Sequence, residues 1–248
     1  MNLSISAASR VGCVRDINED MVLFGEYFIR DEEYSETKNL NGCDRYLIAL
    51  ADGMGGHQSG EVASSETLHH LQYYFNDLPV GLNAGELNEA IVMWLNSINN
   101  TIDIRGREEA VCRGMGTTLV SLAYYGGDFY WINCGDSRIY RLHDNHLRQL
   151  STDHSLNTLM GEREHSHVIT NCIGGGCKNS FIDMVCCTPD VLPGDTFLLC
   201  SDGLTDMVPD DQIETMLAGD ADASALCQRA EDLGGLDNVS AVVVRVGH

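Results

Sequence analysis

Five aspartates stand at the ends of apolar segments spread over nearly the whole chain, and this pattern limits the fold more than any other feature. They are Asp20, Asp52, Asp136, Asp202 and Asp237. In the stretch LIALADGMGGHQSGEVA, the apolar run 47–50 predicts a buried strand that ends at Asp52 and gives way to glycines. Because several strands of one sheet can end at the same edge, remote segments can bring their carboxylates together. We therefore expect a sheet protein with an acidic site at one end.

Three of these aspartates form an Asp-Gly or Asp-Asn pair, at Asp52, Asp202 and Asp237. Each such pair, taken alone, is explained equally well as a plain turn. Repetition at five strand boundaries favours a shared site. Carboxylates packed together repel one another and raise one another's pKa, and divalent cations remove that penalty. Oxygen ligands favour hard ions, so we expect magnesium or manganese rather than zinc, and the chain has no EF-hand spacing for a calcium loop.

The segment VRDINEDMVLF places charged residues directly before the apolar run 21–24. A solvated charged turn is the simpler interpretation of this segment by itself. The functional interpretation gives Arg15 a planar fork for two phosphate oxygens and sets Glu19 and Asp20 beside a metal or its waters.

The composition excludes several classes of partner. The chain has 248 residues, 44% of them hydrophobic, which suits one large domain with its own core. With 37 acidic and 15 basic residues the formal charge is -22, so neither nucleic acid nor an anionic membrane is expected as a partner. The first residues lack the pattern of a secretory leader, and no apolar run approaches the roughly 18 residues of a membrane span. We expect a cytoplasmic protein.

The cysteines and histidines give only weak signals for a metal site. The 10 cysteines are scattered and form no Cys-x-x-Cys pair, so we expect reduced thiols that act as small hydrophobic residues. The pairs His69-His70 and His165-x-His167 are better explained as exposed or satisfied histidines than as ligands.

Hydrophobic periodicity predicts blocks of strands and helices. Strands are expected at 3–8, 21–24, 47–50, 181–187, 197–200 and after Asn238, with a meander over 114–150 that turns at Gly126-Gly127 and Asp144-Asn145. Helices are expected near 59–76, 86–104, 209–217 and 222–233, with a short one near 155–161. The polar stretch 30–45 predicts a surface loop, and residues 151–180 predict an irregular rim beside the site.

Seven short motifs follow one another along the chain. They are R-x-x-N-E-D at Arg15 to Asp20, A-D-G-M-G-G-H at Ala51 to His57, G-M-G-T-T at Gly114 to Thr118, G-D-S-R at Gly135 to Arg138, D-H-S at Asp153 to Ser155, S-D-G-L at Ser201 to Leu204, and D-N at Asp237 and Asn238. Each motif is weak alone, but all of them in this order are specific. The chain thereby resembles the metal-dependent serine/threonine protein phosphatases of the 2C type, and its M-G-G-H motif and compact length resemble the bacterial branch.

The resemblance implies an α+β fold. Its layers form a four-layer αββα sandwich of two antiparallel sheets flanked by helices, with residues 1–248 as a single catalytic domain. A binuclear centre of Mn²⁺ or Mg²⁺ at one end of the sheets is also implied, with a third ion as in many bacterial relatives. The implied metal ligands are Asp20, Asp52, the Gly53 carbonyl, Asp136, Asp202 and Asp237. In this scheme Asp52 bridges two ions, Asp136 serves the third with help from Asp202, and Glu19 and Asn238 act through water or a neighbouring ligand.

The implied activity is the hydrolysis of phosphoserine and phosphothreonine in proteins by a hydroxide that bridges the metals. Arg15 holds the phosphate, and Arg15, Asp52 and Asp136 form the catalytic set. A bacterial serine/threonine kinase is the implied counterpart. Two alternatives stay open: a hydrolase of small phosphate esters with the same chemistry, and a catalytically inactive module that binds phosphoproteins. The intact carboxylates and Arg15 argue against the inactive module.

Two departures from the family pattern concern the reaction and the rim of the site. Met54 stands where many eukaryotic relatives have a histidine proposed as general acid. The leaving-group proton would then come from a metal-bound water or another residue, for which His57 is a nearby candidate. The rim 156–175 is shorter than the usual bacterial flap, which affects substrate gating and the third metal.

Overall fold

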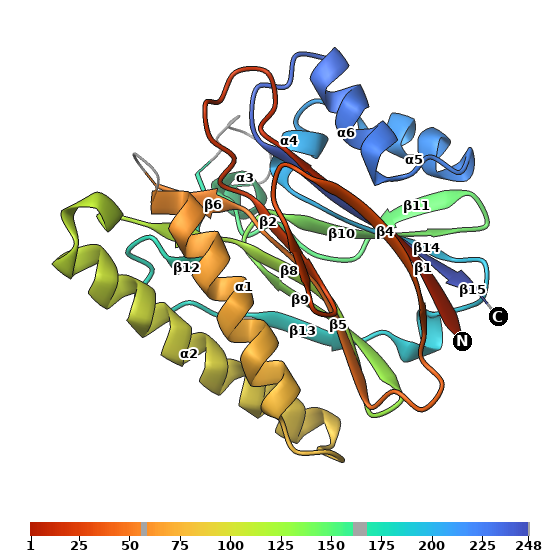
Figure 1. Cartoon of the computed structure of the whole chain (residues 1–248), viewed down its shortest axis with the longest axis horizontal. Coiled ribbons are helices and arrows are strands. Elements are labelled where there is room, and N and C mark those ends of the chain that lie inside the picture. Colours follow the sequence, from red (N-terminus) through yellow and green to blue (C-terminus); the bar gives the residue numbers. More distant parts are fainter. Residues whose placement is uncertain (56–58, 161–167, 248) are drawn as a thin grey trace.

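Two six-stranded antiparallel sheets lie face to face, and helices cover the outer face of each (Figure 1). The protein is seen in a computed structural model that describes residues 1–55, 59–160 and 168–247. A helix with one apolar stripe and a sheet with an apolar face must each bury that face against a neighbour. The four-layer αββα sandwich implied by the sequence is therefore confirmed.

The first sheet has the strand order β11-β10-β14-β15-β1-β4. Its strands are β11 (His146–Gln149), β10 (Arg138–His143), β14 (Thr196–Cys200), β15 (Val239–Gly247), β1 (Asn2–Arg10) and β4 (Glu33–Asn39). At the centre, β15 pairs with β1 from Val239 opposite Arg10 to Gly247 opposite Asn2. The sequence VSAVVVRVG of β15 is almost continuously buried, because helices cover one face of this sheet and the second sheet covers the other.

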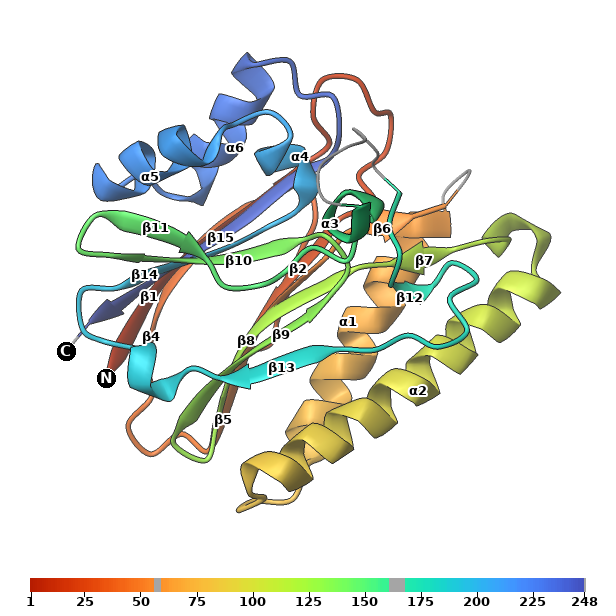
Figure 2. The ribbon, with the colours of Figure 1, turned by 180° about the vertical axis from the view of Figure 1, so that it is seen from behind.

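The second sheet has the order β13-β9-β8-β5-β2-β3. Its strands are β13 (Asp183–Cys186), β9 (Asp128–Cys134), β8 (Leu119–Tyr125), β5 (Arg45–Ala51), β2 (Met21–Phe24) and β3 (Tyr27–Ile29). A separate sheet of three short strands, β12 (Ile173–Gly174), β7 (Gly116–Thr117) and β6 (Gly53–Met54), lies at one end of the sandwich in Figure 2. This small sheet is not predicted from the sequence.

Two groups of helices cover the sandwich. They are α1 (Ser59–Asp77) and α2 (Ala84–Glu108) on the second sheet, and α4 (Asp202–Thr205), α5 (Asp210–Ala218) and α6 (Ala223–Asp232) on the first, with α3 (Leu156–Met160) and the 3-10 turns η1 (Ala110–Cys112) and η2 (Thr188–Asp190) in the connections. Helix α2 begins earlier than predicted because Asn83 and Glu86 form a capping box, in which each side chain accepts a hydrogen bond from the other's backbone N–H. Among the described residues, no helix is both long and apolar enough to cross a bilayer.

Three apolar clusters fill the spaces between the layers. The cluster between the two sheets includes Leu3, Phe24, Ile48, Phe197 and Val242. A second cluster packs α1 and α2 against the second sheet, and a third packs α4, α5 and α6 against the first sheet. Both sheets are thereby buried on two sides, and their strand ends are held at fixed positions.

The prediction of a surface loop at 30–45 is wrong in part, because residues 33–39 form the edge strand β4. The sequence EYSETKN has no buried residue and therefore carries no apolar signal. It becomes a strand through backbone pairing with β1, where Ser35 lies opposite Ser6. Charged side chains along such an edge also hinder pairing with a further strand.

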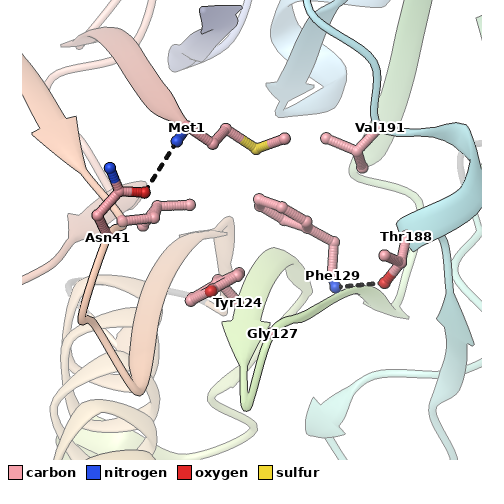
Figure 3. A pocket seen from close by; sticks show the side chains of 8 residues that line it. Met1, Asn41, Tyr124, Gly127, Phe129, Thr188 and Val191 are labelled. Carbon is pink, nitrogen blue, oxygen red and sulfur yellow. Dashed lines mark hydrogen bonds between the residues drawn. The ribbon is translucent and has the colours of Figure 1, made fainter. Parts of the chain in front are cut away.

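The end of the sandwich that lies away from the aspartates holds a small, largely apolar pocket (Figure 3). Its volume is about 150 Å³, and it is lined by Met1, Leu40, Asn41, Tyr124, Gly127, Phe129, Thr188 and Val191. Gly127 lies in the turn between β8 and β9, whose other ends lead to Thr118 and Asp136. The pocket and the aspartates therefore occupy opposite ends of the same strands.

Candidate metal centre

All five aspartates lie close enough to interact electrostatically at one end of the sandwich. The carboxylate of Asp52 interacts with those of Asp20, Asp136, Asp202 and Asp237. The register of the second sheet explains one of these proximities, because Met21 of β2 lies opposite Ala51 of β5. Asp20 directly precedes this pair of residues and Asp52 directly follows it.

The other three aspartates arrive from the first sheet or from the link between the sheets. Asp202 is the first residue of α4, just after β14, and Asp237 stands two residues before β15. These two strands are neighbours, with Cys200 opposite Ala241. Asp136 lies in the turn that carries the chain from β9 of the second sheet to β10 of the first. The site therefore sits at the mouth between the two sheets.

The backbone of Asp52 is fixed by the threonines that enter β8. Its carbonyl accepts hydrogen bonds from Oγ1 of Thr117 at 2.8 Å and from the N–H of Thr118 at 2.9 Å. Its own N–H donates to Oγ1 of Thr118 at 3.0 Å. Burial and the repulsion from the other aspartates raise the pKa of the Asp52 carboxyl well above its ordinary value. In the ionised form, this carboxylate needs a cation.

Asp20 is fully buried, and only part of its carboxylate is satisfied. Oδ2 accepts a hydrogen bond from Oγ of Ser201 at 2.8 Å, whereas Oδ1 accepts none from the described residues. Burial, followed by the charges of Asp202 and Asp237, raises the pKa of Asp20 to about 7. An unpaired buried carboxylate oxygen is costly unless something positive lies beside it.

Asp136 repeats this pattern on the other side of the mouth. Its Oδ1 accepts no hydrogen bond from the residues that the structure describes. Burial, together with the nearby charges of Asp202, Asp153 and Asp206, raises the pKa of Asp136 to about 7. This side chain therefore faces the same repulsion as Asp20, although it lies in a turn instead of before a strand.

Gly53 stands where the backbone of three segments meets. A Cβ on Gly53 would lie 2.1 Å from the carbonyl oxygen of Gly60 and 2.6 Å from that of Glu19, so no side chain fits there. The N–H of Gly60 in turn donates to Oε1 of Glu19 at 3.0 Å. Burial is the main cause that raises the pKa of Glu19. The glycines thus allow the start of α1 to press against the loop before β2.

Arg15 and Asn238 form the outer part of the site. Nη2 of Arg15 donates to Oδ2 of Asp237 at 2.7 Å, and this hydrogen bond is the main cause that raises the pKa of the guanidinium. The Arg15 side chain is 52% exposed, so its other donors face solvent. Oδ1 of Asn238 accepts from the N–H of Glu19 at 2.8 Å, and its Nδ2 donates to the carbonyls of Val11 and Ile17. Asn238 therefore holds the loop that carries Arg15.

A pair of hard cations fits this donor set. Buried carboxylates that repel one another, two of them with an oxygen that has no hydrogen-bond donor among the described residues, are what divalent ions neutralise. Over residues 1–55, 59–160 and 168–247, no three acidic, histidine or cysteine side chains surround one point tightly enough to hold an ion alone. Mg²⁺ usually keeps several waters and takes one or two carboxylates, so water would complete each shell.

The residues that support the aspartates have no role predicted from the sequence. Besides Ser201 and Thr118, they include Arg138, which donates to Asp153 at 2.7 Å, and His154, whose Nδ1 accepts from the N–H of Gly135 at 3.1 Å. All of them lie within the short motifs G-M-G-T-T, G-D-S-R, D-H-S and S-D-G-L. Their place in these motifs is the sequence signal that could have identified them as supporting residues. His57 and the pair His165 and His167 lie outside the described residues, as do all of residues 161–167 in the rim 156–175.

Comparison with known proteins gives consistent matches over nearly the whole chain. The sequence model of the family described as Protein phosphatase 2C matches residues 34–234. The chain is 34% identical to the serine/threonine protein phosphatase PstP of Mycobacterium tuberculosis, over 98% of this chain and 45% of that protein. It therefore spans about half the length of this curated relative.

Solved structures give the same picture. The S. agalactiae serine/threonine phosphatase superposes with a TM-score of 0.83 at 26% identity, covering 98% of this chain and 99% of that chain. The catalytic domain of PstP in complex with two manganese ions superposes with a TM-score of 0.74 at 32% identity, and both chains are covered over 100% of their length.

Proposed function

The chain belongs to the protein phosphatase 2C family, and from this premise we propose that it is a metal-dependent phosphatase acting on phosphoserine and phosphothreonine in proteins. One observation carries the proposal: buried and half-buried carboxylates converge at the mouth between the sheets, and Asp20 and Asp136 each have an oxygen that no described residue satisfies. Such a site favours the binding of hard cations.

We infer two cations per chain, Mn²⁺ or Mg²⁺, with a third at Asp136 and Asp202. The PstP structure with two manganese ions supports the pair. The residues that would hold the ions are Asp20, Asp52, the Gly53 carbonyl, Asp136, Asp202 and Asp237, with Glu19 and Asn238 supporting them from behind. When bound, the cations supply Lewis acidity, which lowers the pKa of a water molecule and neutralises charge on the phosphoryl oxygens.

The protein's own residues would bind and orient the substrate. Arg15 keeps donors facing solvent at the mouth, and its planar fork suits two oxygens of a phosphoryl group. Thr117 and Thr118 fix the backbone of Asp52 before any substrate arrives, which is the preorganisation that favours catalysis. Met54 has no ionisable proton, so water at the mouth or another residue would protonate the leaving serine or threonine oxygen.

The partners and the setting follow from the same proposal. We propose phosphorylated proteins as substrates and a serine/threonine kinase as the opposing enzyme, with residues 1–248 acting as one catalytic domain. The formal charge of -22 argues against nucleic acid and anionic membranes as partners. A cytoplasmic location is supported by the 10 cysteines, all of which are free thiols.

The test is hydrolysis of a phosphothreonine peptide while Mn²⁺ is titrated into metal-free protein. We expect activity to rise from background to saturation with Mn²⁺ and to disappear on addition of EDTA. Phosphorylated metabolites, assayed in parallel, separate a protein phosphatase from a hydrolase of small esters. Full activity in EDTA would contradict the proposal, and so would tight phosphopeptide binding without any turnover in Mn²⁺.

A further inference from the structure

A cationic pocket lies where the end of α2 meets the turns before β7 and after β12. Strands β12 and β7 belong to the same small sheet as β6, which follows Asp52, and Figure 2 shows these elements together. The volume of the pocket is about 230 Å³. The charged residues that line it are Arg107, Arg113, Lys178 and Asp103. Three cations around one opening are unusual in a chain with only 15 basic residues and a formal charge of -22.

Two of the three cations of this pocket are not neutralised by a carboxylate of the described residues. Arg138, by contrast, is held by Asp153 at 2.7 Å. Arg113 and Lys178 have no ion-pair or hydrogen-bond partner among the described residues. Arg107 has one carboxylate partner, Asp103, at 3.6 Å. The pocket therefore offers positive charge that the protein does not itself use.

Backbone without side chains forms part of the pocket wall. Gly114 and Gly176 both line it, with positive φ values of 75° and 85°. A Cβ on either residue would meet nothing within 4 Å. An extended ligand can therefore approach the main chain closely at these two positions.

Two short paths connect the pocket with the candidate metal centre. Gly114 leads into β7, where Oγ1 of Thr117 donates to the carbonyl of Asp52 at 2.8 Å. On the other side, Gly176 follows Gly175, where a Cβ would lie 3.8 Å from Sδ of Met54. Gly114 is three residues from Thr117, and at about 3.3 Å per residue along a strand this segment spans about 10 Å. Because Thr117 contacts Asp52, the pocket lies on the order of 10 Å from Asp52. An extended peptide covers that distance in about three to four residues.

We propose that this cationic pocket binds an anionic side chain of the substrate, a carboxylate or a second phosphate, about three to four residues from the phosphorylated residue. This inference rests on the proposed function, because it assigns a substrate class to the same site. Guanidinium and ammonium groups bind both kinds of anion through charge-assisted hydrogen bonds. The pocket would thus select acidic or doubly phosphorylated peptides, although the protein as a whole is acidic.

The test compares phosphothreonine peptides that carry glutamate, phosphoserine or alanine at the third and fourth positions on either side. Within each protein variant, the readout is the ratio of KM for the alanine peptide to KM for each anionic peptide. In the unmodified protein we expect this ratio to be about 10 or more, equivalent to about 1.4 kcal/mol of preferential binding. In Arg113→Glu and Lys178→Glu it should fall to about 1 or below.

Arg148 provides a matched control. It is exposed on β11 of the first sheet and, like Arg113, has no ion-pair or hydrogen-bond partner among the described residues. Arg148→Glu makes the same change in net charge, and we expect it to keep the ratio of the unmodified protein. An equal loss in Arg148→Glu would overturn the proposal, because net charge and not the pocket would then set the preference.

A binding measurement separates this inference from the proposed function. Fluorescence anisotropy of labelled glutamate and alanine phosphopeptides in EDTA reports affinity without turnover. We expect the glutamate peptide to bind about tenfold more tightly than the alanine peptide and Arg113→Glu to remove that difference. Equal affinities in the unmodified protein would refute the pocket even if hydrolysis is confirmed, whereas unequal affinities without hydrolysis would support the pocket and refute the phosphatase.

Discussion

The two ends of the sandwich are formed by the same strands, but the polar groups at one end are hydrogen-bonded and some of those at the other end are not. At the end away from the site, the backbone N–H of Phe129 donates to Thr188 at 2.8 Å and the amine of Met1 donates to Asn41 at 3.1 Å (Figure 3). At the other end, Asp20 and Asp136 keep carboxylate oxygens without donors from the described residues. A fold that satisfies its polar groups at one end and leaves repelling charges at the other keeps the second end for binding.

The substitution expected to separate the two ends most strongly is Asp52→Asn. Asparagine has almost the same shape and keeps the backbone hydrogen bonds to Thr117 and Thr118, but it removes the central charge. We expect kcat/KM for a phosphothreonine peptide at saturating Mn²⁺ to fall by about 10³-fold or more, equivalent to about 4 kcal/mol. The metal-free variant should also unfold at higher urea concentration than the unmodified protein, because a buried repulsive charge is gone.

Asp44 supplies a control for that substitution, since it is exposed in the turn before β5, far along the strand from Asp52. Asp44→Asn should leave both kcat/KM and the urea midpoint close to those of the unmodified protein. If a folded Asp52→Asn protein retained its activity and bound Mn²⁺ with unchanged affinity, Asp52 would not be the central metal ligand.

The next largest effect is expected at the opposite end, for Phe129→Ala. Phe129 is almost fully buried and contributes to the cluster between the sheets. Truncating a buried phenylalanine costs about 3 to 5 kcal/mol, and we expect about 3 kcal/mol because the ring already borders a pocket. The free energy of unfolding, measured in urea, should fall by this amount, while kcat/KM per folded molecule stays within about twofold. A large loss of kcat/KM in the folded variant would show that the two ends are coupled.

The sequence was more informative about the acidic end than about the apolar pocket. Strand ends can be predicted from where apolar runs stop, and the pairing of Met21 with Ala51 shows why Asp20 and Asp52 meet. The pocket in Figure 3 depends on the packing of residues far apart in the chain, such as Met1 and Val191, which share no sequence pattern. Local periodicity therefore cannot predict it.

Two other features escaped the sequence analysis for different physical reasons. The edge strand β4 is polar and is held by backbone pairing with β1, so its side chains give no strand signal. The supporting serine Ser201 acts through one hydrogen bond to Asp20, and a serine after a strand is more commonly part of a plain turn. The roles of the aspartates as ligands stay a prediction until ions are observed beside them.

A third expected difference between the ends is the response of the metal-free protein to pH. The pKa values of Asp20 and Asp136 are raised to about 7 in the folded protein, against about 3.9 for an unfolded aspartate. Between about pH 4 and 7 the folded state thus holds more protons, so the free energy of unfolding falls as the pH rises. The slope is at most about 1.4 kcal/mol per pH unit for each group.

Urea unfolding in EDTA at pH 5 and pH 6 measures this response. We expect a loss of about 2 kcal/mol in the unmodified protein and a smaller loss in Asp136→Asn. Saturating Mn²⁺ should abolish the loss, because the cations stabilise the ionised carboxylates. The same pH dependence in Mn²⁺ as in EDTA would show that the raised pKa values do not arise at a cation site.

The smallest expected effects come from two hydroxyls, one at each end. Oγ of Ser201 donates to Asp20 at 2.8 Å and accepts from the N–H of Ser240 at 3.0 Å, while Oγ1 of Thr188 donates to Asp128 at 2.9 Å and accepts from Phe129. Ser201→Ala and Thr188→Val should each lower the free energy of unfolding by about 1 kcal/mol. Only Ser201→Ala should raise the Mn²⁺ concentration needed for half-maximal binding at pH 7, because Asp20 loses a donor, its pKa rises further and protons compete better with the ion. Equal shifts of the Mn²⁺ midpoint in both variants would mean that general loosening of the fold, and not the support of one carboxylate, controls metal affinity.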